Sequence, residues 1–317
     1  MMQNKSLFGF LCGLGSVLLW GSFYVVGRFL LFGNHTVGPV FFTFLRFFLA
    51  GLFLLIVLAC QRRLPEIKRA LQQDFRLFLI LGAVGILGEG VLVFASLKYT
   101  TAARSCLFAN ASPIFTALLA YFAAKEALGQ RKVLGMVIGF MGILLAVLGQ
   151  GKGDIFSGQS SYLGDLLALF SGVCWAFYTV LSRKATSKYG GLVNGTAAIV
   201  LGDAMLLALT LCLKNPIRIN FSLSFWLYAL YMGIFPSALA YVLWVSALKH
   251  VEAGKLGSLG YVSALLTMTF SFLLLKERID PIFIGGAIFV VSGIYFMLME
   301  RSPFVRRNCC KRERSAS

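Results

Sequence analysis

The chain has 317 residues, of which 59% are hydrophobic and only 13% are charged, and its net charge is +17. A soluble domain of this size carries about 25% charged residues, so the composition excludes an ordinary soluble domain and points to an integral membrane protein. An excess of Lys and Arg would indicate nucleic-acid binding in a soluble protein, but short loops of membrane proteins also collect basic residues. We therefore expect a lipid bilayer and no nucleic acid as the partner.

Ten apolar runs follow one another along the chain, each close to the roughly 20 residues that cross a bilayer. Their predicted bounds are Leu7–Leu31, Val37–Cys60, Leu77–Leu97, Ala102–Ala124, Val133–Leu148, Tyr162–Leu181, Gly191–Leu213, Leu223–Leu248, Leu256–Leu275 and Ile282–Met299. A lone strand cannot satisfy its backbone in lipid, whereas a helix can. The sequence therefore predicts an all-α integral membrane protein with about ten transmembrane helices.

The basic residues predict the orientation of these helices. With the N-terminus in the cytosol, the cytosolic segments hold 20 Lys and Arg, the outer segments hold 7, and Arg28 and Arg46 lie within spans. Loops rich in Lys and Arg stay in the cytosol. Both termini are therefore predicted to be cytosolic, with residues 301–317 forming a basic cytosolic tail.

The chain also repeats itself. At an offset of 151 positions, residues 96–104 align with 247–255, and Lys125-Glu126 aligns with Lys276-Glu277. Each unit holds five predicted spans, and an odd number of spans inserts the second unit upside down. We therefore predict two inverted five-helix repeats, residues 1–150 and 158–300, which is an architecture of transporters.

Several motifs resemble the EamA-type carriers of the drug/metabolite transporter superfamily. They are Leu45-Arg46-Phe47 with Ala50, residues 95–100 with Ala102-Ala103, Pro113, Lys125-Glu126, and Gly135, Gly139 and Gly142. The resemblance implies ten helices, two five-helix repeats, a central substrate cavity and export of amino acids or related metabolites. Some relatives in intracellular bacteria carry S-adenosylmethionine. The motifs identify the fold well and the substrate poorly.

Aromatic side chains at helical spacing mark several predicted spans. They are Trp20 with Tyr24, Trp175 with Tyr178, Tyr241 with Trp244, and Tyr261. Residues three or four apart share one face of a helix. We predict that these side chains line the substrate cavity and suit a substrate with a flat or apolar part. Buried packing between helices is the alternative.

Three charged residues lie deep inside predicted spans, where an unpaired charge is costly. Arg46 and Glu89 lie on neighbouring spans at a matched depth of roughly 12–14 Å, so we predict an ion pair beside the cavity. Asp203 lies about midway along the seventh span. It could take up and release a proton during transport, which predicts proton coupling, or it could pair with a basic residue and be structural.

Four basic residues lie nearer the ends of spans. Arg28 and Arg104 are predicted near the outer face, and their repeat counterparts Arg183 and Lys255 near the inner face. Each mouth of the cavity would then carry a basic pair that attracts a carboxylate or phosphate. Snorkelling of these long side chains to the membrane surface is the alternative.

The sequence lacks the motifs of common enzymes. It has no Walker A run, no H-E-x-x-H, no G-x-S-x-G and no Cys or His spacing typical of metal sites. We therefore expect no catalytic residue, metal or cofactor, and a non-enzymatic function.

The most direct interpretation is a secondary transporter in a bacterial inner membrane that exports amino acids or related small molecules. An importer or exchanger of a nucleotide-like metabolite such as S-adenosylmethionine is one alternative. A membrane-embedded enzyme or a scaffold is the other. The sequence does not predict the oligomeric state.

Overall fold

The computed structural model describes residues 2–32, 38–100, 102–124, 129–148, 162–213, 222–275 and 281–299. Over these residues the chain is helical and contains no strand, which confirms the predicted all-α fold. The predicted basic tail, residues 301–317, lies outside the described residues.

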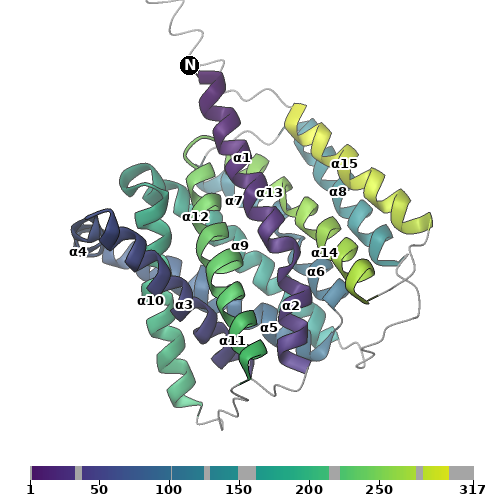
Figure 1. The fold of residues 1–317 in the computed structure, drawn as a ribbon. Coiled ribbons are helices and arrows are strands. Elements are labelled where there is room, and N and C mark those ends of the chain that lie inside the picture. The colour runs from purple at the N-terminus through teal and green to yellow at the C-terminus, as the bar shows by residue number, and fades with distance from the viewer. Residues whose placement is uncertain are drawn as a thin grey trace, which may run out of the picture.

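Figure 1 shows the helices in their order along the chain. The first half of the chain forms α1 (Met2–Gly21), α2 (Phe23–Phe32), α3 (Pro39–Cys60), α4 (Leu64–Leu81), the π-helical turn η1 (Gly82–Gly88), α5 (Glu89–Tyr99), α6 (Ala102–Ala109), α7 (Ser112–Ala124) and α8 (Gln130–Leu148). The second half forms α9 (Tyr162–Tyr189), α10 (Gly191–Cys212), α11 (Leu223–Met232), the π-helical turn η2 (Gly233–Leu239), α12 (Ala240–Ala247), α13 (Ala253–Ser258), α14 (Gly260–Leu275) and α15 (Pro281–Met299).

Six stretches of the described chain are helical, apolar and long enough to cross a membrane. They are Leu7–Gly27, Pro39–Cys60, Leu64–Tyr99, Tyr162–Tyr189, Gly191–Cys212 and Leu223–Ala247. These stretches correspond to six of the ten predicted runs. The other four runs are also helical, over α6–α7, α8, α13–α14 and α15, but they do not reach the same length and apolar composition in the part that is described. The count of ten crossings stays a prediction.

The third predicted span differs from the structure at its start. The sequence placed this start at Leu77, whereas the helix begins at Leu64 with Pro65 in its first turn and bends at Asp74, where φ is −129° and ψ is 41°. The added segment is amphipathic, because the buried Ile67 and Ala70 alternate with exposed polar residues. A search for long apolar runs misses such a segment, because polar residues interrupt the apolar ones.

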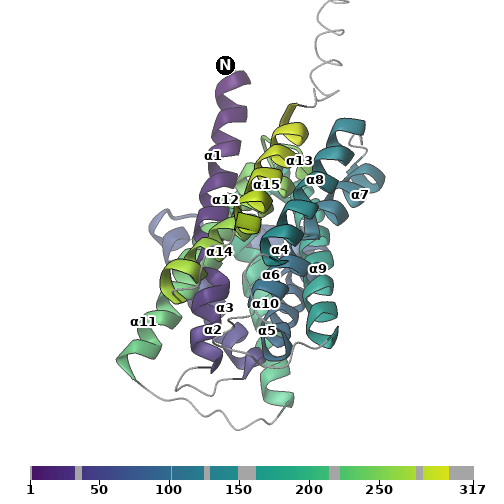
Figure 2. The ribbon, with the colours of Figure 1, turned by 90° about the vertical axis from the view of Figure 1, so that its right-hand side faces the viewer.

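Helices α8 and α15 pack side by side in both views of the molecule (Figures 1 and 2). A methyl group added to Gly135 would lie 2.6 Å from the carbonyl oxygen of Gly293, and one added to Gly142 would lie 2.7 Å from that of Gly286. Only glycine permits such close approach of two backbones. These glycines therefore join the end of the first half of the chain to the end of the second.

Large polar and aromatic side chains are buried between the helices, and many apolar side chains lie on the outer surface of the bundle. Trp244, Arg46 and Tyr178 are among the largest fully buried side chains. By contrast Phe122 and Phe170 are 75% and 57% exposed. Exposed apolar side chains on this scale suit contact with lipid.

Several helices are interrupted near the centre of the molecule. α1 and α2 meet at Ser22, α6 and α7 at Asn110 and Ala111, and α13 and α14 at Leu259. The turns η1 and η2 widen two further helices at their middle. Interruptions of this kind open space between helices and expose backbone groups to side chains.

Candidate functional site

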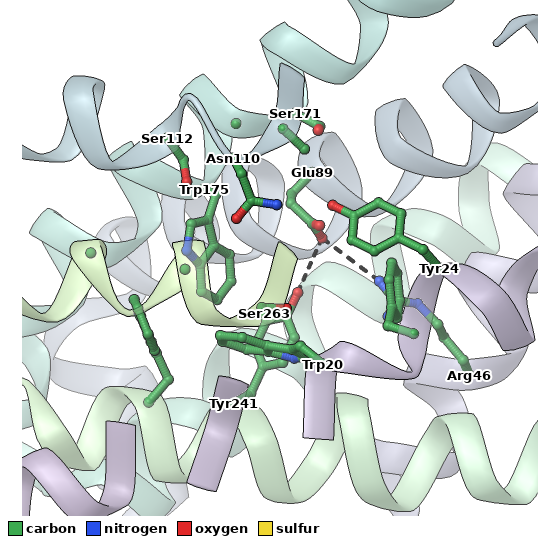
Figure 3. A pocket seen from close by; sticks show the side chains of 16 residues that line it. Trp20, Tyr24, Arg46, Glu89, Asn110, Ser112, Ser171, Trp175, Tyr241 and Ser263 are labelled. Carbon is green, nitrogen blue, oxygen red and sulfur yellow. Dashed lines mark hydrogen bonds and ion pairs between the residues drawn. The ribbon is translucent and has the colours of Figure 1, made fainter. Parts of the chain in front are cut away.

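A cavity lies where these interrupted helices meet. It is bounded by α1, α2, α3, α5, α9 and α12 and by the breaks of α6–α7 and α13–α14 (Figure 3). Seven of the ten residues predicted to line a substrate cavity lie on its wall, namely Trp20, Tyr24, Arg46, Glu89, Trp175, Tyr241 and Trp244. The structure thus brings them together from separate helices. Their contact with a substrate stays a prediction.

Four aromatic rings form one side of the cavity. The ring of Trp20 lies 4.9 Å from that of Trp175, 5.9 Å from that of Tyr241 and 5.2 Å from that of Trp244, measured between centroids. The first two contacts are edge-to-face, an arrangement that aromatic rings favour. The cluster therefore holds itself together and offers ring faces and edges to the cavity.

Two of these rings are also fixed by hydrogen bonds. The indole N–H of Trp20 donates to the backbone carbonyl of Pro236 at 2.8 Å, and that of Trp244 donates to Thr179 Oγ1 at 3.1 Å. A buried indole usually finds such a partner. Trp20 is thereby tied to η2, whereas Trp244 is tied to α9.

The predicted ion pair is present on the cavity wall, next to Tyr241 of this cluster. Arg46 Nη2 lies 3.7 Å from Glu89 Oε2, and the hydroxyl of Tyr241 donates to the same carboxylate oxygen at 3.1 Å (Figure 3). The exposed fraction is 1% for the Arg46 side chain and 15% for Glu89. The two charges therefore face each other away from bulk water, with the carboxylate the more accessible partner.

The guanidinium of Arg46 sits among aromatic rings. Its Cζ atom lies 4.1 Å from the ring centroid of Phe47, 4.8 Å from that of Phe23 and 5.1 Å from that of Phe94. Its Nη1 donates to Ser237 Oγ at 3.3 Å, while Nε and Nη2 have no hydrogen-bond partner among the described residues. Aromatic faces stabilise a cation, but they do not replace hydrogen-bond acceptors. The site therefore retains N–H groups that an oxygen of a ligand could satisfy.

Small polar residues that the sequence analysis did not select complete the wall. They are Asn110, Ser112, Ser171 and Ser263. A signal for the first two was available, because Pro113 inside an apolar run predicts an interrupted helix, and interrupted helices border transport cavities. Ser112 and Ser263 are also 151 positions apart, which is the repeat offset of the sequence.

The three remaining predicted cavity residues lie elsewhere. Tyr178 is buried behind Trp175, with a ring distance of 5.3 Å. The hydroxyl of Tyr261 donates to the carbonyl of Met136 on α8 at 3.2 Å. Asp203 lies on α10, and its Oδ1 is buried with no hydrogen-bond partner in the part of the chain that is described. None of the three lines the cavity.

The predicted entrance charges are placed only in part. Arg183 lies on α9 and Lys255 on α13, and both side chains are partly exposed. The side chains of Arg28 and Arg104 lie outside the described part of the chain. A basic pair at each mouth stays a prediction.

Comparison with protein families connects this arrangement to known proteins. The model of a family described as EamA-like transporter family matches residues 7–148 and again residues 162–299. The two matches together cover most of the chain. The division of the chain into two inverted repeats stays a prediction.

Two relatives are similar over nearly the whole chain. The uncharacterized transporter YyaM of Bacillus subtilis (strain 168) is 29% identical over 282 residues, which are 88% of this chain and 91% of the relative. An uncharacterized transporter of Archaeoglobus fulgidus is 29% identical over 282 residues, 88% of this chain and 93% of the relative. A solved crystal structure superimposes with a TM-score of 0.74 at 23% identity, covering 93% of this chain and 96% of that one, and thus shares the fold.

Proposed function

We propose, since the chain belongs to the EamA-like transporter family, that it is a secondary carrier that moves a small organic metabolite across the membrane through the central cavity. The observation that carries this proposal is the cavity itself, whose wall combines an aromatic cluster with a buried ion pair. Sites for small molecules combine apolar walls with a few convergent polar groups. The relatives named above are transporters, in line with a non-enzymatic role.

The substrate class we favour is an amino acid or a related compound, and the direction is export. The open N–H groups of Arg46 suit a carboxylate, and the partly exposed Glu89 suits an ammonium group. The aromatic cluster around Trp20 and Trp175 suits an apolar or flat side chain. A nucleotide-like cation such as S-adenosylmethionine would use the same rings and Glu89 but would be imported or exchanged.

The architecture we propose is ten crossings in two inverted repeats, in a bacterial inner membrane with both termini in the cytosol. Three observations support it. The family model matches twice, η1 and η2 each span seven residues and begin 151 positions apart, and α8 and α15 each span 19 residues at the same separation. The 20-to-7 distribution of Lys and Arg supports the orientation.

Ligand binding and flux test the transport function. The purified protein is screened against a metabolite library by thermal shift, because a ligand of the native state raises the apparent stability. Hits are then followed as flux in right-side-out and inside-out vesicles. Amino acids that stabilise the protein and leave right-side-out vesicles support the proposal. A library without any stabilising ligand or flux would overturn it, and a hit of the S-adenosylmethionine class would favour import or exchange.

A pair of substitutions on α9 tests whether the substrate contacts the aromatic cluster. Trp175→Leu removes a cavity ring, and Phe177→Leu removes a ring that is 42% exposed two positions further along. Loss of aromatic contact should raise KM by at least about tenfold for Trp175→Leu, since burial of a large apolar side chain is worth roughly 1.5–3 kcal/mol and about 1.4 kcal/mol is a factor of ten. Phe177→Leu should leave KM unchanged. Equal effects of both would place the substrate elsewhere.

Proton coupling through Asp203 is part of the proposal. A buried carboxylate with an unbonded oxygen can exchange a proton when the surrounding helices move. Asp203→Asn should abolish the accumulation that an imposed pH step drives, while exchange at equal concentrations continues. Accumulation by the variant against a gradient would show that Asp203 is not the coupling group.

Orientation is tested by cysteine labelling. Cysteines are introduced at Ser157 and Ser315, which lie outside the described residues, in a background without the native cysteines. An impermeant thiol reagent on intact cells should label position 157 and spare position 315. The reverse pattern would require the opposite topology.

A further inference from the structure

The turns η1 and η2 are connected to each other through the walls of the cavity. One connection starts at η1, where the hydroxyl of Tyr241 lies 3.4 Å from the carbonyl oxygen of Gly85 and 3.1 Å from Glu89 Oε2. A phenol has one hydrogen to donate. The carbonyl of η1 and the carboxylate of the cavity therefore compete for it.

The second connection ends at η2. Ser237 Oγ donates to the carbonyl of Met232 at 2.7 Å and accepts from Arg46 Nη1 at 3.3 Å. In a regular α-helix the N–H of residue 236 would donate to that carbonyl, but Pro236 has no N–H. The Ser237 hydroxyl thus adds a side-chain donor at the carbonyl that Pro236 cannot reach, and Arg46 holds the hydroxyl in place.

The ion pair joins these two connections into one chain of contacts. It runs from Gly85 through Tyr241 and Glu89 to Arg46, and from there through Ser237 to Met232. The central contacts, at 3.3 Å and 3.7 Å, are long for charge-assisted hydrogen bonds, which are usually about 2.7–2.9 Å. Loose contacts of this kind can be exchanged for contacts with a ligand at little cost.

We propose that Tyr241 and Ser237 are positioning residues that couple occupancy of the cavity to η1 and η2, which act as paired hinges. A ligand carboxylate that engages Arg46 withdraws the guanidinium from Ser237, and a ligand cation that engages Glu89 releases the Tyr241 hydroxyl to Gly85. Both turns therefore respond to one ligand, although they lie far apart in the sequence. The inference rests on the proposed transport through this cavity.

Hydrogen–deuterium exchange of the full chain in nanodiscs, without any substrate, tests the coupling. Ser237→Ala should speed amide exchange in residues 233–239 by about five- to tenfold, the effect of losing one net hydrogen bond. The coupling predicts faster exchange in residues 82–88 as well, by at least about twofold. A change confined to residues 233–239 would overturn the coupling.

Two further variants serve as controls. Ser237→Thr keeps a hydroxyl that can bond to the preceding turn, so both segments should return to wild-type exchange. Trp244→Phe removes a cavity hydrogen bond that goes to Thr179 and to neither turn. It should leave both segments unchanged, and equal acceleration by Trp244→Phe would show that the bundle merely loosens as a whole.

Kinetics distinguish a failure of the coupling from a failure of the transport proposal. Ser237 does not line the cavity, so Ser237→Ala should act mainly on turnover, which we expect to fall about tenfold because the substitution uncouples occupancy of the cavity from η2. Unchanged turnover would overturn the coupling, whereas absence of flux in the wild type would overturn the transport function. If Ser237→Ala does not fold, Tyr241→Phe provides the same exchange test, with faster exchange expected first in residues 82–88.

Discussion

The turns η1 and η2 have the same length but are stabilised in different ways. η2 contains Pro236, and the hydroxyl of the next residue donates to the Met232 carbonyl. η1 contains no proline and begins and ends with glycine. A methyl group added to Gly82 would lie 2.6 Å from the backbone nitrogen of Gly202 on α10.

A π-helical turn can therefore be produced by its own residues or by packing against neighbouring helices. In η2 the missing N–H of proline disfavours a regular helix at that point, so the deformation is encoded locally. In η1 the close approach of α10 and of the Tyr178 ring, which a side chain at Gly85 would overlap, leaves room only for backbone. We therefore expect the shape of η1 to depend more on its neighbours than that of η2, although η2 also approaches α3 closely, with a methyl group added to Gly233 lying 2.7 Å from Leu49 Cβ.

The largest expected effect comes from breaking the ion pair that links the turns. Arg46→Met strands the Glu89 charge, and removal of one partner of a buried pair typically costs about 3–5 kcal/mol. The double variant Arg46→Met, Glu89→Met should be more stable than Arg46→Met alone. Folded yield and thermal denaturation in detergent of both single variants and the double variant measure the coupling energy. Strictly additive losses would mean that the two side chains do not interact.

A smaller loss is expected from filling the contact between η1 and α10. Gly82→Ala pushes a methyl group against backbone that cannot move easily, and such overpacking costs about 1–3 kcal/mol. Gly285→Ala on α15 is the matched control, because a methyl group there meets nothing within 4 Å. Thermal denaturation should show a lower midpoint for Gly82→Ala and an equal or higher one for Gly285→Ala. An unchanged midpoint for Gly82→Ala would show that packing against α10 does not determine the shape of η1.

The smallest expected effect concerns the hydrogen bond from the Ser237 side chain to the Met232 carbonyl. Ser237→Ala should destabilise the protein by about 1 kcal/mol, the net value of one hydrogen bond. In a Pro236→Ala background the new backbone N–H can donate to the Met232 carbonyl, so the same substitution should cost less. A double-mutant cycle in thermal denaturation checks this difference. Equal costs in both backgrounds would show that the hydroxyl does not compensate for the proline.

Sequence patterns predicted the helical class and the ion pair because both follow from the cost of polar groups in lipid. Because Arg46 and Glu89 were predicted at the same depth, pairing was the least costly arrangement for both charges. Arg46 Nη2 lies 3.7 Å from Glu89 Oε2 in the structure. The aromatic residues were harder to place. Tyr178 shares one spacing signal with Trp175, and Tyr261 has no aromatic partner at helical spacing, so the sequence does not show which ring the rotation of each helix turns toward the cavity.

The amphipathic start of α4 and the two π-helical turns were not predicted. Residues 64–76 are too polar for a hydropathy signal, although Pro65 and the alternation of buried and exposed positions mark a helix start. η1 is invisible in the sequence, because the cause of its shape lies on α10, more than a hundred positions away. For η2 the sequence holds an unused signal in Pro236, since a proline inside an apolar run predicts an interrupted helix.

The glycine contacts between α8 and α15 have a consequence for biosynthesis. The glycines of α8 leave the ribosome about 150 residues before their partners on α15, because Gly135 meets Gly293. During that interval the bare backbone surface of α8 has only lipid or other chains to contact. Contacts between segments so distant in sequence form late in folding. Helix α15 thus covers the glycine surface of α8 late in synthesis, and a ribosome that stops before residue 281 releases a protein with an unprotected glycine surface that membrane quality control could recognise.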